Sequence, residues 1–124
     1  MSEPAERVVV CRVGRERFAI PVGAVSEVVA TPPRARMPGV SPAVRGIANV
    51  RGSLITTLSG PALLGFPADV PAEWLLLLTG WRGRVGLEVD EVEDLFALED
   101  HDDVPLLALD TLLEPLLGPE PSRR

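Results

Sequence analysis

Two polar side chains two residues apart, Asn49 and Arg51, are the first candidates for chemistry in this sequence. They lie in residues 44–58, VRGIANVRGSLITTL, where two apolar runs of strand length meet at Arg51-Gly52. Alternate residues of a strand share a face, so the Asn49 amide and the Arg51 guanidinium would offer their donors together. The pattern predicts a recognition surface. For an isolated Asn-x-Arg-Gly, a solvated Arg beside a structural Gly would be the better interpretation.

Acidic residues form the second candidate cluster. Glu88 and Asp90 alternate on a predicted strand, and Asp94 lies in an acidic run over residues 90–103. Acid–base catalysis needs carboxyl groups whose pKa values are perturbed, and strand positions that face water do not provide this. The sequence has no nucleophile paired with a base and no glycine-rich nucleotide motif. A small acidic β-barrel enzyme that uses these three residues is therefore kept only as the alternative from another class.

The sequence does not predict a metal site. His101 has no second His or Cys at ligand spacing, and the acidic run lacks the Gly and the terminal Glu of an EF-hand loop. A solvated acidic face explains this run better than a metal site does. We therefore expect neither a metal nor a cofactor.

Composition restricts the class of protein. The chain has 124 residues, 46% of them hydrophobic, which suits one domain with a real core. The net charge is −6 and the 12 basic residues, all Arg, form no basic run, so a nucleic-acid footprint is not expected. The single Cys11 fits a core position or a reducing compartment. Without a signal sequence or an apolar run long enough to span a bilayer, the chain is expected to be cytoplasmic.

The secondary structure around these groups is predicted to be mainly β. Residues 8–13 and 18–22 predict a hairpin with a short polar turn. Residues 22–29 carry Val at helical spacing, which predicts a short helical turn with Glu27 on its outer face. Residues 31–42 are rich in Pro and small residues and are expected to form a loop.

The central strand pair over residues 44–58 is expected to be bent. Gly46 and Gly52 stand where a strand normally carries side chains, which indicates a bulge or a sharp turn. We therefore assign both glycines a structural role in this bend.

The last third of the chain predicts a second hairpin and a short helix. Residues 73–79 and 84–89 flank the turn sequence GWRG; the first arm should be buried on both faces and the second half exposed. Residues 105–109 predict a last short strand, and Asp110 is a candidate cap of the helix that follows. Residues 119–124 are expected to form a disordered tail.

Four segments of the chain resemble the CheW-like family of bacterial chemotaxis-type adaptors, which couple chemoreceptors to a histidine kinase. FAIPVGAVSEVV resembles the strand and turn of that family, and MPGVSPAVRGIANVRGSLI its Gly-x-x-Asn-x-Arg-Gly signature. RVGLEVDEVEDL resembles its Gly-x-x-Val-Asp-x-Val strand, and PLLALDTLL its closing strand and helix. The four segments follow the order of the family and cover most of the chain.

The resemblance implies a mainly β fold of two small SH3-like barrels packed together, with short helical turns and a short C-terminal helix. Residues 1–118 would form this single domain. The groove between the barrels would receive the helical tip of a methyl-accepting chemoreceptor, with no enzymatic activity and no membrane insertion. The residues assigned to this groove are Val25, Glu27, Ile47, Asn49, Arg51 and Leu87.

Two departures from the family pattern shape the functional hypothesis. After Arg51-Gly52 the chain reads ITTLSGPALLG, without the Pro and Asp usual in the family. Between Leu98 and Pro105 it has only EDHDDV, where the family has a long segment that includes a barrel strand. One barrel should therefore be truncated.

The truncation suggests a shortened accessory adaptor, resembling those of the gliding-motility Frz type. Such a protein would bind its receptor while binding to the CheA-like kinase is weakened or lost. The first alternative is a complete coupling protein that also recruits the kinase. A truncated barrel would also leave an unpaired sheet edge, through which a homodimer could form.

Overall fold

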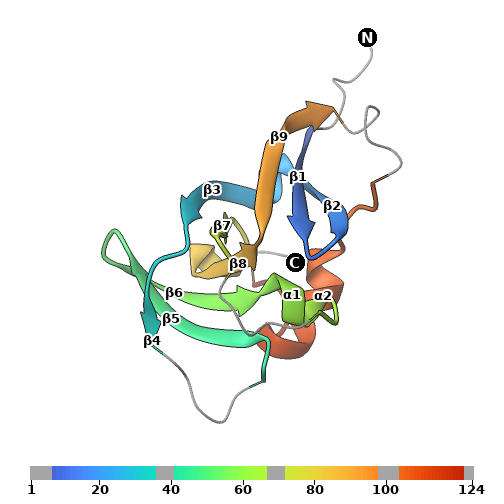
Figure 1. Cartoon of the computed structure of the whole chain (residues 1–124). Coiled ribbons are helices and arrows are strands. Elements are labelled where there is room, and N and C mark those ends of the chain that lie inside the picture. The colour runs from blue at the N-terminus through green and yellow to red at the C-terminus, as the bar shows by residue number, and fades with distance from the viewer. Residues whose placement is uncertain (1–6, 36–40, 67–71, 98–103, 122–124) are drawn as a thin grey trace.

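Two β-sheets and a few short helices form the fold, which confirms the mainly β prediction (Figure 1). The computed structural model describes residues 7–35, 41–66, 72–97 and 104–121. The strands are β1 (Arg7–Val13), β2 (Glu16–Pro21), β3 (Val25–Ala30), β4 (Arg34–Ala35), β5 (Val44–Val50), β6 (Ser53–Ser59), β7 (Trp74–Leu78), β8 (Val85–Val89) and β9 (Glu91–Ala97). The helical elements are η1 (Val22–Ala24), α1 (Gly60–Leu63), η2 (Trp81–Gly83) and α2 (Leu109–Leu117).

The smaller sheet has three strands in the order β2-β1-β9, all antiparallel. The predicted first hairpin is confirmed as β1 and β2. Strand β9 pairs with the other edge of β1, so the acidic run begins as a strand. Beyond β2, Leu106 adds an isolated parallel bridge to Ala19 in place of the predicted strand over residues 105–109.

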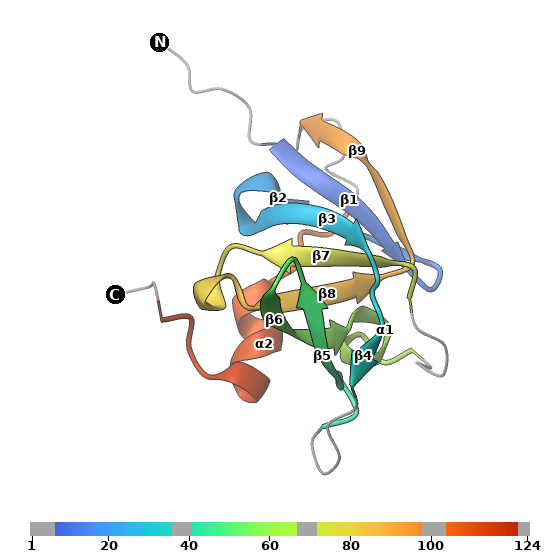
Figure 2. The same cartoon turned by 90° about the vertical axis from the view of Figure 1, so that its left-hand side faces the viewer.

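The larger sheet has six strands in the order β3-β7-β8-β6-β5-β4. The two other predicted hairpins, β5–β6 and β7–β8, are both present, and β6 joins them by parallel pairing with β8. Figure 2 shows β1 and β9 above β3 and β7, with the β5–β6 hairpin and α2 below them. The two sheets therefore form two layers. The chain crosses between them at η1, which connects β2 to β3, and at the connection from β8 to β9.

Strands β7 and β8 lie at the centre of the core because other side chains cover both of their faces. Leu75 and Leu77 pack with Ile55 in one cluster, while the alternating residues face a larger cluster shared with the smaller sheet and α2. The larger cluster includes Cys11, Ile20, Leu58, Leu76, Leu78, Leu87, Val89 and Leu113. A third cluster on the smaller sheet contains Val8, Val10, Ala19 and Val104.

The predicted helical turn over residues 22–29 is wrong for most of its length. Only η1 is helical, and β3 begins at Val25. Half-buried Val25, Glu27 and Val29 alternate with exposed residues along β3, which is the period of a strand. Branching at Cβ favours the extended backbone for valine, and pairing with β7 supplies the hydrogen bonds that a helix would otherwise provide.

The prediction that the second arm of the last hairpin is half exposed is also wrong. All five residues of β8 are buried, and the side chain of Glu88 is only 1% exposed. Strand β8 lies between β7 and β6, so it has no edge and neither face reaches water. The first arm, β7, is buried on both faces as predicted.

The C-terminal helix is present, with differences at both ends. Asp110 lies in its first turn, and the N-cap is Ala108, without a side-chain hydrogen bond. Glu120, predicted to lie in a disordered tail, is instead buried, and its Oε1 accepts a hydrogen bond of 2.8 Å from the backbone N–H of Trp81. Residues 122–124 lie outside the described residues.

The predicted truncation concerns a segment that is mostly outside the described residues, 98–103. On either side of it, the described part of the smaller sheet consists of three strands and the single bridge at Leu106. Among the described helices, none has the length and apolar character needed to cross a membrane.

Candidate functional site

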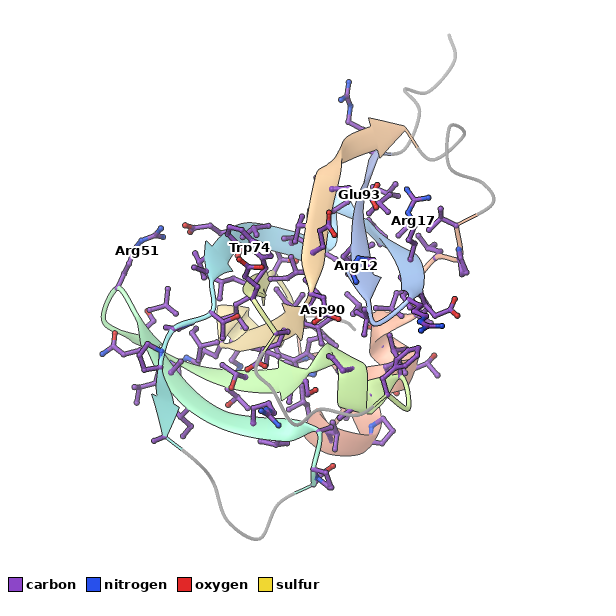
Figure 3. All side chains as sticks on the ribbon, viewed as in Figure 1. Arg12, Arg17, Arg51, Trp74, Asp90 and Glu93 are labelled. Atoms are coloured by element: carbon purple, nitrogen blue, oxygen red, sulfur yellow. The ribbon has the colours of Figure 1, made fainter. Side chains whose placement is uncertain are left out.

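The tip of the β5–β6 hairpin fixes Arg51 in an exposed position. Arg51 and Gly52 have φ values of 52° and 87°, and two successive positive φ angles are typical of the tight turns whose twist matches a hairpin. The Asn49 side-chain oxygen accepts a hydrogen bond of 2.8 Å from the Gly52 N–H. Asn49 therefore supports the turn, and Arg51 projects from the tip of the hairpin (Figure 3).

Gly46 lies at a β-bulge near the other end of β5. The register of β5 against β6 shifts between Val44 and Gly46, and Gly46 has a φ of 151°. The Gly46 carbonyl accepts a hydrogen bond of 3.2 Å from Thr57 Oγ1. Both glycines thus occupy backbone conformations that favour glycine, in line with the predicted bend.

Arg51 forms a two-pronged ion pair with Glu27 of β3. Arg51 Nη1 donates to Glu27 Oε1 at 2.6 Å, and Nη2 donates to Oε2. Strand β3 is one edge of the six-stranded sheet, and β5–β6 lies near the other edge. The pair therefore ties together two parts of the sheet that are distant in strand order.

The pair remains open to solvent. The side chain of Arg51 is 69% exposed and that of Glu27 36% exposed. The hydrogen bonds from Arg51 hold the pKa of Glu27 below its ordinary value, and those to Glu27 raise the pKa of Arg51. Both groups are therefore charged near neutral pH and within reach of an external partner.

A groove runs between the two sheets, alongside β3. It has a volume of about 330 Å³ and combines apolar side chains with the carboxyl groups of Glu27 and Glu93. Its lining comes from η1 and β3 on one side and from β1 and β9 on the other. The residues that line it are Val9, Val22, Val25, Ser26, Glu27, Val28, Val92 and Glu93.

The predicted site residues fall into three groups. Val25 and Glu27 line this groove, and Arg51 is joined to it through Glu27. Asn49 supports the turn, and half-buried Ile47 lies on β5 outside the groove lining. Leu87 alone forms the third group, because it is buried in the core.

Leu87 was assigned to the groove but belongs to the core. Its side chain is 2% exposed and packs in the cluster between the two sheets. The reason is the position of β8 in the middle of the larger sheet, where an apolar residue on either face meets another layer. Leu87 therefore cannot contact a partner without unfolding.

The sequence interpretation assigned Val25 to the groove but missed the other valines of its lining. Val22 and Val28 are 37% and 36% exposed, which is high for large apolar side chains. The strand period of residues 25–30 would have placed Val28 with the exposed residues, had the helical period not been preferred. Val92 lies across the groove on β9, and no local pattern links it to β3.

Charged pairs stabilise the far wall of the groove. Arg17 donates to both oxygens of Glu93, at 3.0 and 2.7 Å, and Arg12 donates to Glu91 Oε2 at 3.0 and 2.9 Å. Figure 3 shows Arg12, Arg17 and Glu93 gathered on the smaller sheet, away from Arg51. These contacts link β1 and β2 to β9 on the outside of a sheet whose strands are already paired by their backbones.

Glu88 and Asp90, the two residues of the enzyme alternative whose side chains the structure describes, each make a contact within the fold. Glu88 is buried and faces Arg45, with 3.9 Å between Glu88 Oε1 and Arg45 Nε, so its predicted exposure is wrong. Asp90 Oδ2 accepts a hydrogen bond of 2.7 Å from the Gly14 N–H. The side chain of Asp94 is outside the described part, and the described residues hold no cluster of three or more His, Cys, Asp or Glu that could bind a metal.

Comparison with known proteins places this geometry in a family. The model of the CheW-like domain family matches residues 7–118. The Chemotaxis protein CheW of Rhizobium meliloti is 29% identical over 107 residues, which cover 85% of this chain and 69% of the relative. The Probable chemotaxis protein CheW of Rhizobium etli is 27% identical over 103 residues, covering 82% of this chain and 66% of that protein.

A solved structure supports the fold. The scaffolding protein TtCheW from Thermoanaerobacter tengcongensis matches with a TM-score of 0.69 and 21% identity, over 76% of this chain and 66% of that one. The chain thus spans about two thirds of the length of the proteins it matches.

The match extends from the start of β1 to the residue that ends α2, so it includes both sheets, the groove and the Arg51 hairpin. Proteins of this kind are scaffolds and adaptors rather than enzymes, which removes the enzyme alternative. The sequence match therefore covers both sheets, the groove between them and the Arg51-Gly52 hairpin tip. The chain belongs to the CheW-like domain family.

Proposed function

We propose that this protein is a chemotaxis-type signalling adaptor in the cytoplasm that binds the cytoplasmic tip of a methyl-accepting chemoreceptor. The observation that carries the proposal is the groove beside β3, at whose wall Glu27 holds the exposed guanidinium of Arg51. The groove would take the apolar stripe of a receptor helix, and Arg51 would contact its polar flank.

The groove has the composition that a helix partner requires. Val22, Val25 and Val28 lie along one wall and Val92 along the other, so an apolar stripe at helical spacing can be buried between two valine surfaces. Two of these side chains are already partly exposed in the free protein. Binding would therefore remove apolar surface from water without first opening the core.

Arg51 can contribute through exchange of partners. Arg51 donates two hydrogen bonds to the carboxylate of Glu27. A carboxylate on a receptor helix could accept the same two hydrogen bonds in place of Glu27. Because the pair is exposed, replacing Glu27 by a receptor carboxylate requires little desolvation. Such an exchange gives orientation and specificity more than affinity.

The test is calorimetric binding of the receptor cytoplasmic domain to a groove variant. Val28→Asp places a charge in the groove at a position that is already 36% exposed, and Val25→Asp does so closer to η1. We expect either change to abolish binding. Leu106→Asp is the matched control, because Leu106 is 50% exposed and lies outside the groove lining. Unchanged affinity of Val28→Asp with a folded protein would refute the groove as the receptor site.

We further propose that the protein is a shortened accessory adaptor, similar to the Frz type, whose binding to a CheA-like kinase is weakened or lost. The supporting observation is the smaller sheet, whose described part holds three strands and one bridge. A kinase domain that packs against the end of this sheet would meet a reduced surface. Normal binding of the kinase regulatory domain in a pull-down would favour the complete coupling protein instead.

The proposed homodimer would use the free edge of β9, since β9 pairs only with β1 among the described strands. An unpaired edge can add a strand from a second chain. Sedimentation velocity over a concentration series tests this: a single monomeric species at all concentrations would exclude the dimer.

A further inference from the structure

We propose that the receptor helix carries a carboxamide side chain, of asparagine or glutamine, that pairs with the backbone of Val28 at the free edge of β3. The inference rests on the proposed receptor groove and names the polar contact that this groove requires. Strand β3 is an edge of the larger sheet and pairs only with β7 among the described strands. Its other side therefore offers backbone N–H and C=O groups to a partner.

The groove follows the edge of β3 rather than one of its faces. Successive side chains of a strand point to opposite faces, yet the four consecutive residues 25–28 of β3 all line the groove. The opposite wall comes from β1 and β9. Figure 2 shows β3 between β7 and β1, so its unpaired edge lies on the side of the smaller sheet. A partner that fills the groove therefore covers backbone as well as side chains.

The pairing of β3 with β7 determines which backbone groups face the groove. The Thr31 N–H donates to the Glu73 carbonyl at 2.9 Å, and opposite residues of an antiparallel pair are hydrogen-bonded alternately. The register continues from there without a shift as far as Glu27. Val29 is therefore hydrogen-bonded to β7. Val28 and Ala30 turn their N–H and C=O groups away from β7.

Val28 is the residue best placed to meet a partner with both of its backbone groups. Ala30 has the same orientation but lies outside the groove lining. Glu27 lines the groove, but by the same alternation its backbone groups face β7. Val25 also lines the groove, but its N–H donates to the carbonyl of Val22 in η1.

An apolar helix stripe alone would bury the N–H and C=O of Val28 without hydrogen-bond partners. Leaving polar groups unsatisfied in an interface is unfavourable, and the loss would oppose the gain from the valines of the groove. The backbone of the receptor helix cannot supply the partners, because its own N–H and C=O groups are paired within the helix. A side chain of the helix must therefore do so.

A carboxamide matches this pair of groups. Its NH₂ group donates and its oxygen accepts, so one side chain can satisfy the C=O and the N–H of the same residue. A carboxylate has acceptors only, whereas a guanidinium or an ammonium group has donors only, so each of these would leave one group of Val28 unpaired. The contact is thus distinct from the one proposed for Arg51, which selects a carboxylate.

The first test is amide hydrogen exchange of the full chain, alone and with the cytoplasmic fragment of a methyl-accepting chemoreceptor from the same organism. In the free protein we expect the amides of Val28 and Ala30 to exchange rapidly and that of Val29 slowly. Receptor binding should slow exchange at Val28 by at least about tenfold and leave Ala30 unchanged.

Two backbone variants of the chain locate the contact. Replacing the peptide N–H of Val28 by an ester oxygen removes the donor and keeps the side chain, and it should weaken receptor binding about tenfold. The same change at Ala30 is the matched control, because this N–H also points away from β7 but lies outside the groove lining. Both variants should keep the fold, since neither N–H is used in the pairing with β7.

Variants of the receptor fragment identify the carboxamide. Each asparagine and glutamine of the receptor tip is changed, one at a time, to the corresponding acid, which keeps the shape but removes the donor. One such change should weaken binding to the unmodified chain about tenfold. It should have little further effect on the Val28 ester, because the two changes remove the same contact.

The outcomes separate this inference from the function on which it rests. Absence of receptor binding to the unmodified chain would overturn both. Receptor binding that the two esters weaken equally, or that no carboxamide change weakens, would overturn the inference alone. Protection of Ala30 together with Val28 would show that a partner strand adds to β3, which would also overturn it.

Discussion

The β5–β6 hairpin holds two arginines that each face a glutamate, and the two pairs differ chiefly in their access to water. Arg51 and Glu27 form a bidentate contact with side chains that are 69% and 36% exposed. Arg45 and Glu88 are 3.9 Å apart, Nε to Oε1, with side chains that are 19% and 1% exposed. The same residue types thus serve the surface at one end of the hairpin and the core at the other.

Access to water determines which of the two ion pairs can take part in recognition. Opening an exposed pair returns both groups to water, so a partner can take over one of them at little cost. Opening the buried pair would leave a carboxyl group inside the protein without the charge opposite it, which is strongly unfavourable. Burial, not residue identity, therefore separates a binding contact from a structural one.

The largest effect is expected for the buried pair. Arg45→Met keeps an unbranched apolar stem but removes the guanidinium and its charge, and breaking a buried pair in this way should cost about 3–5 kcal/mol of unfolding free energy. Urea denaturation followed by circular dichroism measures the loss. In the double variant Arg45→Met/Glu88→Leu most of the stability should return, because apolar packing replaces both charges. A loss as small as that of a surface substitution would show that the pair is not buried in solution.

The next prediction concerns Arg51, whose ion pair with Glu27 is exposed. Arg51→Ala should weaken binding of the receptor domain by about tenfold, as for the loss of one charge-assisted contact, while the thermal midpoint moves by no more than a few degrees. Arg51→Lys is the control: it keeps the charge but loses the planar fork, so its affinity should lie between the two. Strong thermal destabilisation by Arg51→Ala would assign the pair a structural role instead.

A smaller effect is expected for the turn that presents Arg51. Gly52 has a φ of 87°, and a Cβ there would meet nothing within 4 Å, so the strain of Gly52→Ala is conformational alone. We expect a stability loss of about 1 kcal/mol in urea denaturation. The comparison is Gly23→Ala, where the same added Cβ meets open space and the backbone does not adopt a positive φ. Equal losses in both variants would mean that the turn conformation is not the cause.

The contrast between the exposed hairpin tip and the buried strand β8 also explains what the sequence could and could not predict. The hairpin tip was predictable because Asn49, Arg51 and Gly52 are close in sequence and the turn chemistry is local. Glu88 was misplaced because alternation cannot reveal that β8 is a central strand covered on both faces, whereas Leu87 was assigned to the groove through the family resemblance. That burial results from β6 pairing in parallel with β8, a contact between distant parts of the chain.

The partner of Arg51 was identified in part. Glu27 was assigned to the same groove through the family resemblance, but the helical interpretation of residues 22–29 hid the strand that presents it. The valine opposite, Val92, could not be predicted because it comes from the other sheet. Local patterns thus predict single elements, while the groove depends on how the two sheets pack.

The smallest expected effect is a change in the pKa of Glu27. Hydrogen bonds from Arg51 are the main cause that lowers this pKa below its ordinary value of 4.5. Because the folded-state pKa is depressed, the pair is fully formed above pH 4.5 and is lost as the pH falls through the lower folded-state value. In Arg51→Ala the pKa of Glu27 should rise toward its ordinary value, which carboxyl NMR titration measures directly. If the pKa of Glu27 is equal in both proteins, the ion pair does not persist in solution, and Arg51 would be available to a receptor without any exchange.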